Sequence, residues 1–344
     1  MIEKSGVIPG MVSVIICAWN NWPDVEMTID SALHQSYRPV DVIVVDNSSS
    51  DETPQELPRL FCNRVRYIRQ PNRGDAGAYN TGFEVARGEF IQFVDGDDVL
   101  APNKIEKQVE VFRADPELDI VYGNVRMFQS MAGLTRWNDP STQEEEDMLR
   151  ALLYPGPGIC ALGTLFHRKA LEKVGRWDES LYIADHDYFL RAAWAGCRFG
   201  HCSLVPVGFA RERPGQMTKN DSAMMTGAVA LWGKALGYVT SEPYRSLIAA
   251  ELARCRLNLA LSKSTSKREA LAILALARAG SPDTVSALRY ALVRAAIAIP
   301  ALLSPSLRGI RHCVLASLRW YGATPGGMRH KRTSNIKQRA KEER

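Results

Sequence analysis

Three aspartates stand together in the segment Asp95-Gly96-Asp97-Asp98. They follow the apolar run Phe90–Val94, which predicts a strand buried on both faces. In an open α/β sheet, ligands bind beyond the carboxyl ends of the strands. Clustered carboxylates repel one another, and their oxygens suit a hard cation such as Mg²⁺ or Mn²⁺. The segment therefore indicates a divalent-metal site, with a helix-capping turn before Pro102 as the alternative.

A further acidic position, Asp46, ends the largely apolar run Val40–Val45. A carboxylate at a strand end can accept a hydrogen bond from the imide N–H of uracil or thymine. The residues after it, Asn47–Asp51, are all of types that favour turns for local reasons. A nucleotide site and a plain turn both stay open at this point.

The elements that must position these residues alternate along the chain. The expected strands are 12–17, 40–45, 65–68, 90–94, 119–122 and 162–166. The expected helices are 23–35, 102–114, 169–174 and 185–195, with another that closes over 82–87 and ends at Gly88 as its cap. This alternation predicts an α/β fold, with a mostly parallel sheet that helices flank.

The second half of the chain has a different character. The stretch Met131–Arg150 is polar and irregular, which favours a loop or a solvated helix. Beyond about residue 225, Ala/Leu/Arg-rich stretches with helical periodicity cover 246–261, 267–279, 284–303 and 307–320. We therefore expect a catalytic domain over 1–225, an all-helical C-terminal region over 226–325, and a tail over 326–344.

Composition and charge narrow the class of protein. Of 344 residues, 46% are hydrophobic and 24% are charged, as in ordinary globular proteins. The seven cysteines are scattered and form no CxxC pair, which favours reduced thiols in the cytoplasm. We find no secretory signal and no apolar stretch long enough to span a membrane.

The net charge of +5 is a property of the tail, since residues 329–344 hold seven Lys/Arg and two Glu. A disordered, solvated tail is the expected state, and peripheral contact with the inner face of a membrane is the alternative. The stretch 288–303 could likewise lie at a membrane interface, although packing in a core is favoured. No nucleic-acid partner is predicted.

Seven short motifs occur in order over residues 11–218. They are Ser13–Asn20, Val45–Ser48, Asn72–Gly82, Gly88–Phe90, Asp95–Asp98 with Pro102 behind it, Val174–Glu179, and Asp185–Asp187. Their order and spacing resemble the family 2 inverting glycosyltransferases, which have the GT-A fold. The resemblance does not extend to the helical region after about residue 225.

The resemblance implies a role for each matching position. The base of a nucleotide would be held by Cys17, Trp19 and Asp46. The DxD motif falls on Asp95 and Asp97, which would hold a divalent cation (Mn²⁺ or Mg²⁺), with Asp97 the direct ligand and Asp95 also next to the nucleotide. Tyr79 stands where the family often has an arginine.

For the catalytic base, the resemblance points to Asp185 at the start of the last predicted helix. A helix N-terminus keeps a carboxylate ionised, as a base must be. Asp187 is the rival, but it lies four residues before Arg191, at the spacing of an ion pair within a helix. The family usually has a glutamate at the position that Ala184 occupies here.

The resemblance also implies that the segment Arg211–Gln216 closes over the donor, with Arg211 or Arg213 on the diphosphate.

The function that the resemblance implies is metal-dependent transfer of a sugar, with inversion, from a UDP or dTDP donor to an acceptor hydroxyl. The acceptor could be a glycan, a lipid-linked or a small molecule, in glycan or polysaccharide biosynthesis; the oligomeric state stays open. A nicotinamide-dependent oxidoreductase is disfavoured because no GxGxxG follows the first strand. A nucleotidyltransferase is disfavoured because the Gly-rich, Arg-containing loop that it would need after the first strand is absent from this sequence. A catalytically degenerate GT-A binding or scaffold protein is the remaining alternative.

Overall fold

The structure is a computed structural model that describes residues 6–130, 133–138, 147–153, 159–203, 206–213, 215–260 and 271–275. The chain divides into two compact units, Met1–Cys255 and Arg256–Arg344. The predicted tail and most of the helical stretches beyond residue 260 lie outside the described residues. Within the described residues, no helix is long and apolar enough to cross a membrane.

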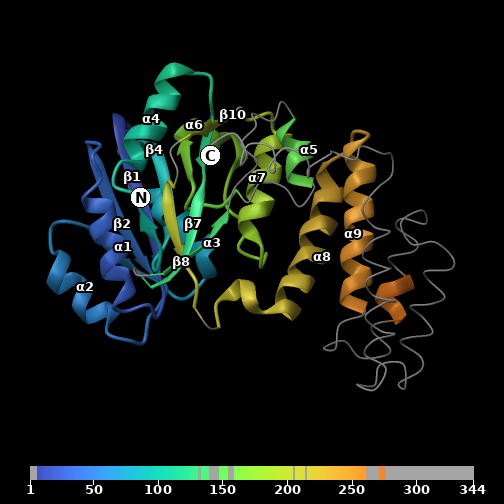
Figure 1. The fold of residues 1–344 in the computed structure, drawn as a ribbon, viewed down its shortest axis with the longest axis horizontal. Coiled ribbons are helices and arrows are strands. Elements are labelled where there is room, and N and C mark those ends of the chain that lie inside the picture. Colours follow the sequence, from blue (N-terminus) through green and yellow to red (C-terminus); the bar gives the residue numbers. More distant parts are fainter. Residues whose placement is uncertain are drawn as a thin grey trace, which may run out of the picture. The chain divides into compact units, whose positions relative to one another are not determined.

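A seven-stranded sheet forms the centre of the first unit (Figure 1). Its order is β10-β6-β9-β4-β1-β2-β3. The strands are β1 (Ile8–Ala18), β2 (Val40–Asp46), β3 (Arg66–Arg69), β4 (Gly88–Asp95), β6 (Ile120–Gly123), β9 (Thr164–His167) and β10 (Phe199–Cys202). Only β9 runs antiparallel to its neighbours in this sheet, β4 and β6. The predicted fold class, a mostly parallel sheet with flanking helices, is confirmed.

Helices cover both faces of the sheet because the β1 side chains alternate between two cores. Val12, Val14 and Ile16 pack with apolar residues of α1 (Asp24–Leu33), α2 (Thr53–Phe61) and α4 (Lys104–Ala114). Ile15 and Cys17 point to the opposite core. There they meet residues of α3 (Gly74–Val85), α6 (Arg168–Val174) and α7 (Ala184–Trp194).

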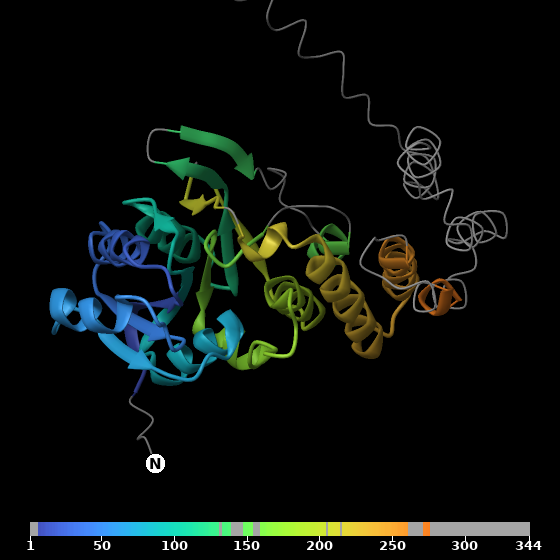
Figure 2. The same cartoon turned by 90° about the horizontal axis from the view of Figure 1, so that it is seen from below.

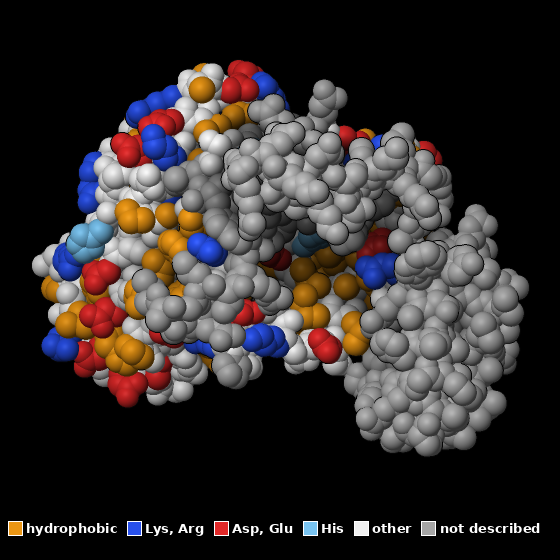
Figure 3. All heavy atoms as spheres, in the orientation of Figure 1, with side chains coloured by type: hydrophobic (Ala, Val, Ile, Leu, Met, Phe, Trp, Pro, Cys, Tyr) orange, Lys and Arg blue, Asp and Glu red, His pale blue; other side chains and the backbone are white. Residues whose placement is uncertain are grey.

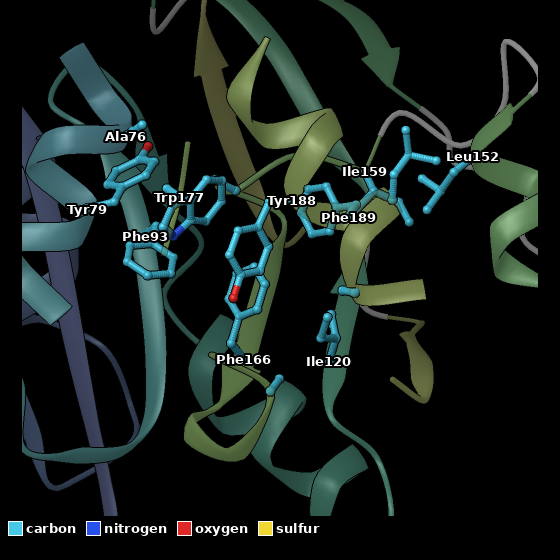
Figure 4. Packing of buried hydrophobic residues seen from close by; sticks show 14 of the residues in the cluster. Ala76, Tyr79, Phe93, Ile120, Leu152, Ile159, Phe166, Trp177, Tyr188 and Phe189 are labelled. Carbon is cyan, nitrogen blue, oxygen red and sulfur yellow. The ribbon is translucent and has the colours of Figure 1, made fainter. Parts of the chain in front are cut away.

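An aromatic cluster fills that opposite core (Figure 4). Trp177 stacks on Tyr188 with ring centroids 4.2 Å apart, and Tyr79 meets Trp177 edge-on at 5.2 Å. Phe93 of β4 lies against both Tyr79 and Trp177. Tyr79, Phe93 and Tyr188 come from α3, β4 and α7, and Trp177 from the segment between α6 and α7, so the cluster holds three elements and that segment in fixed relation.

A second, four-stranded sheet has the order β5-β11-β7-β8. It consists of β5 (Val99–Leu100), β7 (Val125–Ser130), β8 (Gly133–Asn138) and β11 (Gly208–Arg211). In Figure 2 the hairpin β7–β8 stands at the edge of the first unit. The expectation of a loop or helix for Met131–Arg150 was therefore wrong for β8, whose short run GLTRWN lacks a strand-like apolar pattern.

One predicted helix cap was also wrong. Helix α3 ends at Val85, and Gly88 begins β4 instead of capping the helix. A Cβ on Gly88 would lie 2.5 Å from the backbone N of Ser13, so this glycine permits a close approach of two strands. Gly175 and Gly196 do have the positive φ of helix-ending glycines, at 85° and 70°.

Three further helices lie among the described residues. They are α5 (Met148–Leu153), α8 (Asp221–Tyr238) and α9 (Tyr244–Ala260), with a 3₁₀ turn over Met217–Lys219. Leu231 and Trp232 of α8 and Ile248 of α9 belong to the same buried cluster as the α7 residues. Helix α8 crosses the expected boundary at residue 225, and the compact unit extends to Cys255.

Candidate functional site

The strand order reverses at β1, which pairs with β2 on one side and β4 on the other. Open α/β sheets bind ligands in the crevice at such a point, beyond the carboxyl ends of the strands. Cys17 is in register with Val45 of β2 and with Asp95 of β4. The sheet thus brings together three positions that the sequence singles out, namely Cys17, Asp46 and Asp95.

The loop after β4 is drawn tightly against the end of β1. A Cβ on Gly96 would lie 2.7 Å from the backbone oxygen of Cys17, so glycine alone fits between the two aspartates without a shift of the backbone. Asp98 is buried, and its Oδ1 accepts a hydrogen bond from the backbone N of Arg211 at 2.9 Å. Asp98 therefore fixes the acidic loop to β11.

Asp95 is accessible to solvent yet deeply surrounded by protein. Its Oδ1 accepts a hydrogen bond from the Tyr79 hydroxyl at 2.5 Å. Burial, followed by the charge of Asp75, raises the pKa of Asp95 to about 8. Tyr79, which stands where an arginine is common in the resembling family, thus contacts the first carboxylate of the DxD motif.

Asp75 is a site residue that the sequence analysis missed. It lies in the first turn of α3, and its Oδ1 is 3.4 Å from the Sγ of Cys17. Burial, and the charge of Asp185 beyond it, raise the pKa of the Asp75 carboxyl. The sequence did show an aspartate at this position inside the motif Asn72–Gly82. An acidic residue is common in the first turn of a helix, however, so it did not single out a site.

The second DxD carboxylate faces two arginines. Asp97 Oδ2 is 2.9 Å from a guanidinium nitrogen of Arg213. Arg211 donates from its Nε to the backbone oxygen of Asp97 at 3.1 Å, and its guanidinium lies 3.2 Å from Asp24. Burial nevertheless raises the pKa of Asp97, because the two arginines compensate only in part. Pro214, in the same predicted loop, lies outside the described residues.

The carboxylates fit a divalent cation that is shared with a ligand. Within the described residues, no group of three His, Cys, Asp or Glu side chains could hold a metal ion by itself. Mg²⁺ is commonly bound by one or two carboxylates together with substrate phosphates. Asp95 and Asp97 supply two carboxylates whose pKa values are raised, by burial above all and then by neighbouring carboxylates. The donor set therefore suits a hard cation once a diphosphate completes it.

On the other side of the crevice, Trp19 is 52% exposed directly after β1, where a planar ligand could stack on it. Asp46 is fully buried, and its oxygens accept from the Ser49 backbone N at 2.8 Å and the Tyr67 hydroxyl at 2.6 Å. The guanidinium of Arg69 lies 3.8 Å from Oδ2 of the same carboxylate, so three groups of the protein already contact Asp46. In this structure Asp46 shapes the loop after β2.

Asp185 and Asp187 point to different surroundings, as their spacing on α7 requires. Asp185 is half-buried, and its charge raises the pKa values of both Asp75 and Asp95. Asp187 is fully buried and pairs with the Nε of Arg191 at 2.8 Å. The charge of Asp185 thus acts on two carboxylates of the acidic crevice, whereas Asp187 pairs with an arginine of its own helix.

The neighbouring His186 is occupied by structural contacts. One ring nitrogen lies 3.0 Å from the backbone oxygen of Leu152, and the ring packs against Trp232. Burial lowers the pKa of His186, so the ring is neutral near pH 7. Figure 3 shows acidic and basic side chains interspersed with hydrophobic ones on the described surface of the molecule.

Comparison with known proteins gives one family match, in which residues 13–175 match the model of glycosyl transferase family 2. An uncharacterized glycosyltransferase of Nostoc sp. is 32% identical over 178 residues, covering 47% of this chain and 52% of the relative. The succinoglycan biosynthesis protein ExoO of Rhizobium meliloti is 33% identical, covering 57% of this chain and 58% of the relative. The chain thus spans little more than half the length of these two relatives.

Two solved structures share the fold. Residues 1–349 of Staphylococcus aureus TarS, in complex with UDP-GlcNAc, superpose with a TM-score of 0.58 at 17% identity, covering 83% of this chain and 91% of that one. The mannosyltransferase PcManGT of Pyrobaculum calidifontis, with GDP-Man and Mn²⁺, gives 0.53 at 21% identity, covering 90% and 84%. At these identities the likeness establishes the fold alone.

Proposed function

Because residues 13–175 match the model of glycosyl transferase family 2 and the chain has the GT-A fold, we propose that it transfers a sugar, with inversion, from a nucleoside diphosphate donor to an acceptor hydroxyl. The observation that carries this proposal is the meeting of Asp95, Asp97, Arg213 and Asp185 at the switch point of the sheet. Acidic and basic groups of this kind suit a metal-bound diphosphate on one side and a proton acceptor on the other.

The donor would lie across the carboxyl ends of β1 and β4. Trp19 would stack on the base, with Cys17 and Asp46 beneath it, and Arg211 and Arg213 would face the diphosphate. Asp97 and Asp95 would hold Mn²⁺ or Mg²⁺, which when bound neutralises charge on the departing nucleoside diphosphate. The mannosyltransferase crystallised with Mn²⁺ supports a divalent cation.

Asp185 is our candidate for the base that takes the proton from the acceptor hydroxyl. It lies in the first turn of α7, and no charged partner competes for it among the described contacts. Deprotonation and attack of the hydroxyl oxygen on the anomeric carbon would occur together, with the nucleoside diphosphate as leaving group. One displacement inverts the anomeric centre, so no covalent sugar–protein intermediate is required.

The site chemistry favours certain nucleotide bases in the donor, and the relatives suggest a class of acceptor. The lone carboxylate Asp46 favours a base with one imide N–H, and hence UDP or dTDP. The role of ExoO in succinoglycan biosynthesis supports a place in polysaccharide biosynthesis for this chain as well. A cytoplasmic location, with peripheral membrane contact as an addition, stays a prediction from the sequence.

A donor screen tests the function. The full chain would be incubated with UDP-, dTDP- and GDP-sugars and Mn²⁺ or Mg²⁺, with thermal shift and slow donor hydrolysis as readouts. We expect one donor to stabilise the protein only with metal, Asp97→Ala to abolish this effect, and Asp185→Asn to keep binding but lose turnover. If no nucleotide sugar binds with either metal, the enzyme proposal fails and a scaffold role takes its place.

A further inference from the structure

Two arginines near the end of β11 reach the acidic loop in different ways. Arg211 is held on several sides, because its backbone N binds Asp98, its Nε binds the Asp97 backbone and its guanidinium pairs with Asp24. The guanidinium also lies 4.6 Å from the centre of the Phe128 ring. With a side chain only 12% exposed, Arg211 is a fixed part of the loop.

Arg213 is held by its backbone while its guanidinium stays accessible. It lies two residues beyond the end of β11, and its backbone N donates to Gln216 Oε1 at 2.9 Å. Its side chain is 38% exposed, and among the described contacts its one ion pair is that with Asp97. A side chain with a single charged partner and a fixed backbone can exchange that partner by rotation alone.

Asp97 needs a cation whether or not a metal is present. Asp95, Asp98 and Asp24 all lie close enough to repel its charge or to repel one another. The guanidinium of Arg211 pairs with Asp24. Arg213 is therefore the group that pairs directly with the Asp97 carboxylate. Arg213 therefore takes up the position from which a metal would approach Asp97 Oδ2.

We propose that Arg213 and the divalent cation are alternative partners of Asp97, so that Arg213 keeps the metal site closed until the donor arrives. Guanidinium groups bind phosphate oxygens in bidentate fashion. An incoming diphosphate offers Arg213 a second anion and releases the Asp97 carboxylate for the metal. Donor and metal then bind cooperatively because each removes the competition that weakens the other. The release of Asp97 by the diphosphate rests on the proposed function, whereas the competition between Arg213 and the metal at Asp97 does not.

The test measures Mn²⁺ binding to the full chain without any nucleotide, from the electron paramagnetic resonance signal of free Mn²⁺. We expect Arg213→Gln and Arg213→Ala to bind Mn²⁺ about tenfold more tightly than the parent protein, within the range of ordinary site-to-site couplings. Arg213→Lys, which keeps the positive charge, should stay close to the parent. Arg59→Gln, at an exposed pair with Glu56, serves as the matched control.

A second measurement adds UDP and GDP at fixed Mg²⁺. Here the neutral variants should bind the nucleotide several-fold more weakly, opposite in sign to their effect on Mn²⁺ alone, since one phosphate contact is lost. Unchanged or weaker Mn²⁺ binding by the neutral variants overturns the proposal, as does undetectable Mn²⁺ binding by every variant. If Mn²⁺ binding tightens but no nucleotide binds even to the parent protein, the competition stands and the transferase proposal falls.

Discussion

The Nζ of Lys234 lies 2.9 Å from Oδ2 of Asp187, and this ion pair joins α8 to the helix that carries Asp185. The same ammonium group donates to Asp178 at 2.6 Å and lowers the pKa of that carboxyl to about 2. Because Asp187 is fully buried, its charge depends on Lys234 and Arg191 for compensation. The part of the chain beyond residue 225 thus supports the start of α7.

Replacing Lys234 by Met should destabilise the protein by about 2 kcal/mol, the order of one lost contact to a buried charge. Turnover should also fall, since the N-terminus of α7 positions Asp185. Urea unfolding and donor-hydrolysis rates would measure the two effects, and Lys234→Arg should recover part of both. Thr226→Ala, on the exposed side of α8, is the control. Full stability in Lys234→Met would mean that Arg191 alone suffices.

Asp185→Asn should reduce kcat by a factor of about 10² to 10⁴ and leave donor affinity nearly unchanged, because a missing base affects the proton transfer alone. Asp187→Asn makes the matched comparison, since it should lower the free energy of unfolding instead. Single-turnover kinetics and chemical unfolding separate these outcomes. If Asp187→Asn lowered kcat more than Asp185→Asn did and left stability intact, Asp187 would be the base and Asp185 the structural residue.

Asp75→Asn should stabilise the protein slightly in the absence of metal, since it removes one of several like charges from a site where solvent screens part of their repulsion. The sign follows from the raised pKa of Asp75. Above its unfolded-state pKa the folded protein resists ionisation of this group, so the stabilisation should grow as the pH rises above about 4. Saturating Mn²⁺ should reduce the difference. Asp221→Asn, at an exposed carboxylate, is the control, and destabilisation by Asp75→Asn would show that Asp75 is needed for the fold.

Lys104 is fully buried, and burial lowers its pKa to about 7. Its ammonium group donates to the side-chain oxygens of Gln92 and Gln108 and has no carboxylate partner among the described contacts. Between pH 7 and about 10.5 the unfolded chain binds a proton that the folded protein has lost, so stability should rise with pH there. The slope from this group alone is at most about 1.4 kcal/mol per pH unit.

Lys104→Met should flatten that slope, and the free energy of unfolding measured from pH 6.5 to 9.5 would record it. Lys107→Met is the matched control on the same helix, because Lys107 is exposed and pairs with Glu110. An unchanged slope in Lys104→Met would mean that Lys104 keeps its proton in the folded protein.

The fold was predictable from the sequence where burial of apolar side chains alone determines the local pattern. The runs in β1, β2 and β4 are apolar because both faces of those strands are buried, and that pattern is visible without tertiary information. The strands β8 and β11 were missed because they are short and lie in a small sheet with weak apolar patterning. Gly88 was misassigned because a strand crossing and a helix cap both require glycine.

The site was predictable as a set of motifs but not as a set of contacts. Asp95 and Asp97 follow a buried strand, so their clustering could be inferred from spacing. The approach of Asp75 to Cys17, and that of Arg213 to Asp97, depends on pairings between residues far apart in the chain. No local pattern encodes those distances, and so sequence reasoning could name the residues but not their partners.

The short pairing of β5 with β11 has a consequence for how the protein is made. Phe209 pairs with Val99 across more than a hundred intervening residues, and this pairing seats the arginines on the acidic loop. A nascent chain that ends before Gly208 can already form the parallel core from β1 to β4, because those strands are contiguous in sequence. Completion of the ion pairs must wait for a late, long-range closure, which is a slow kind of folding step.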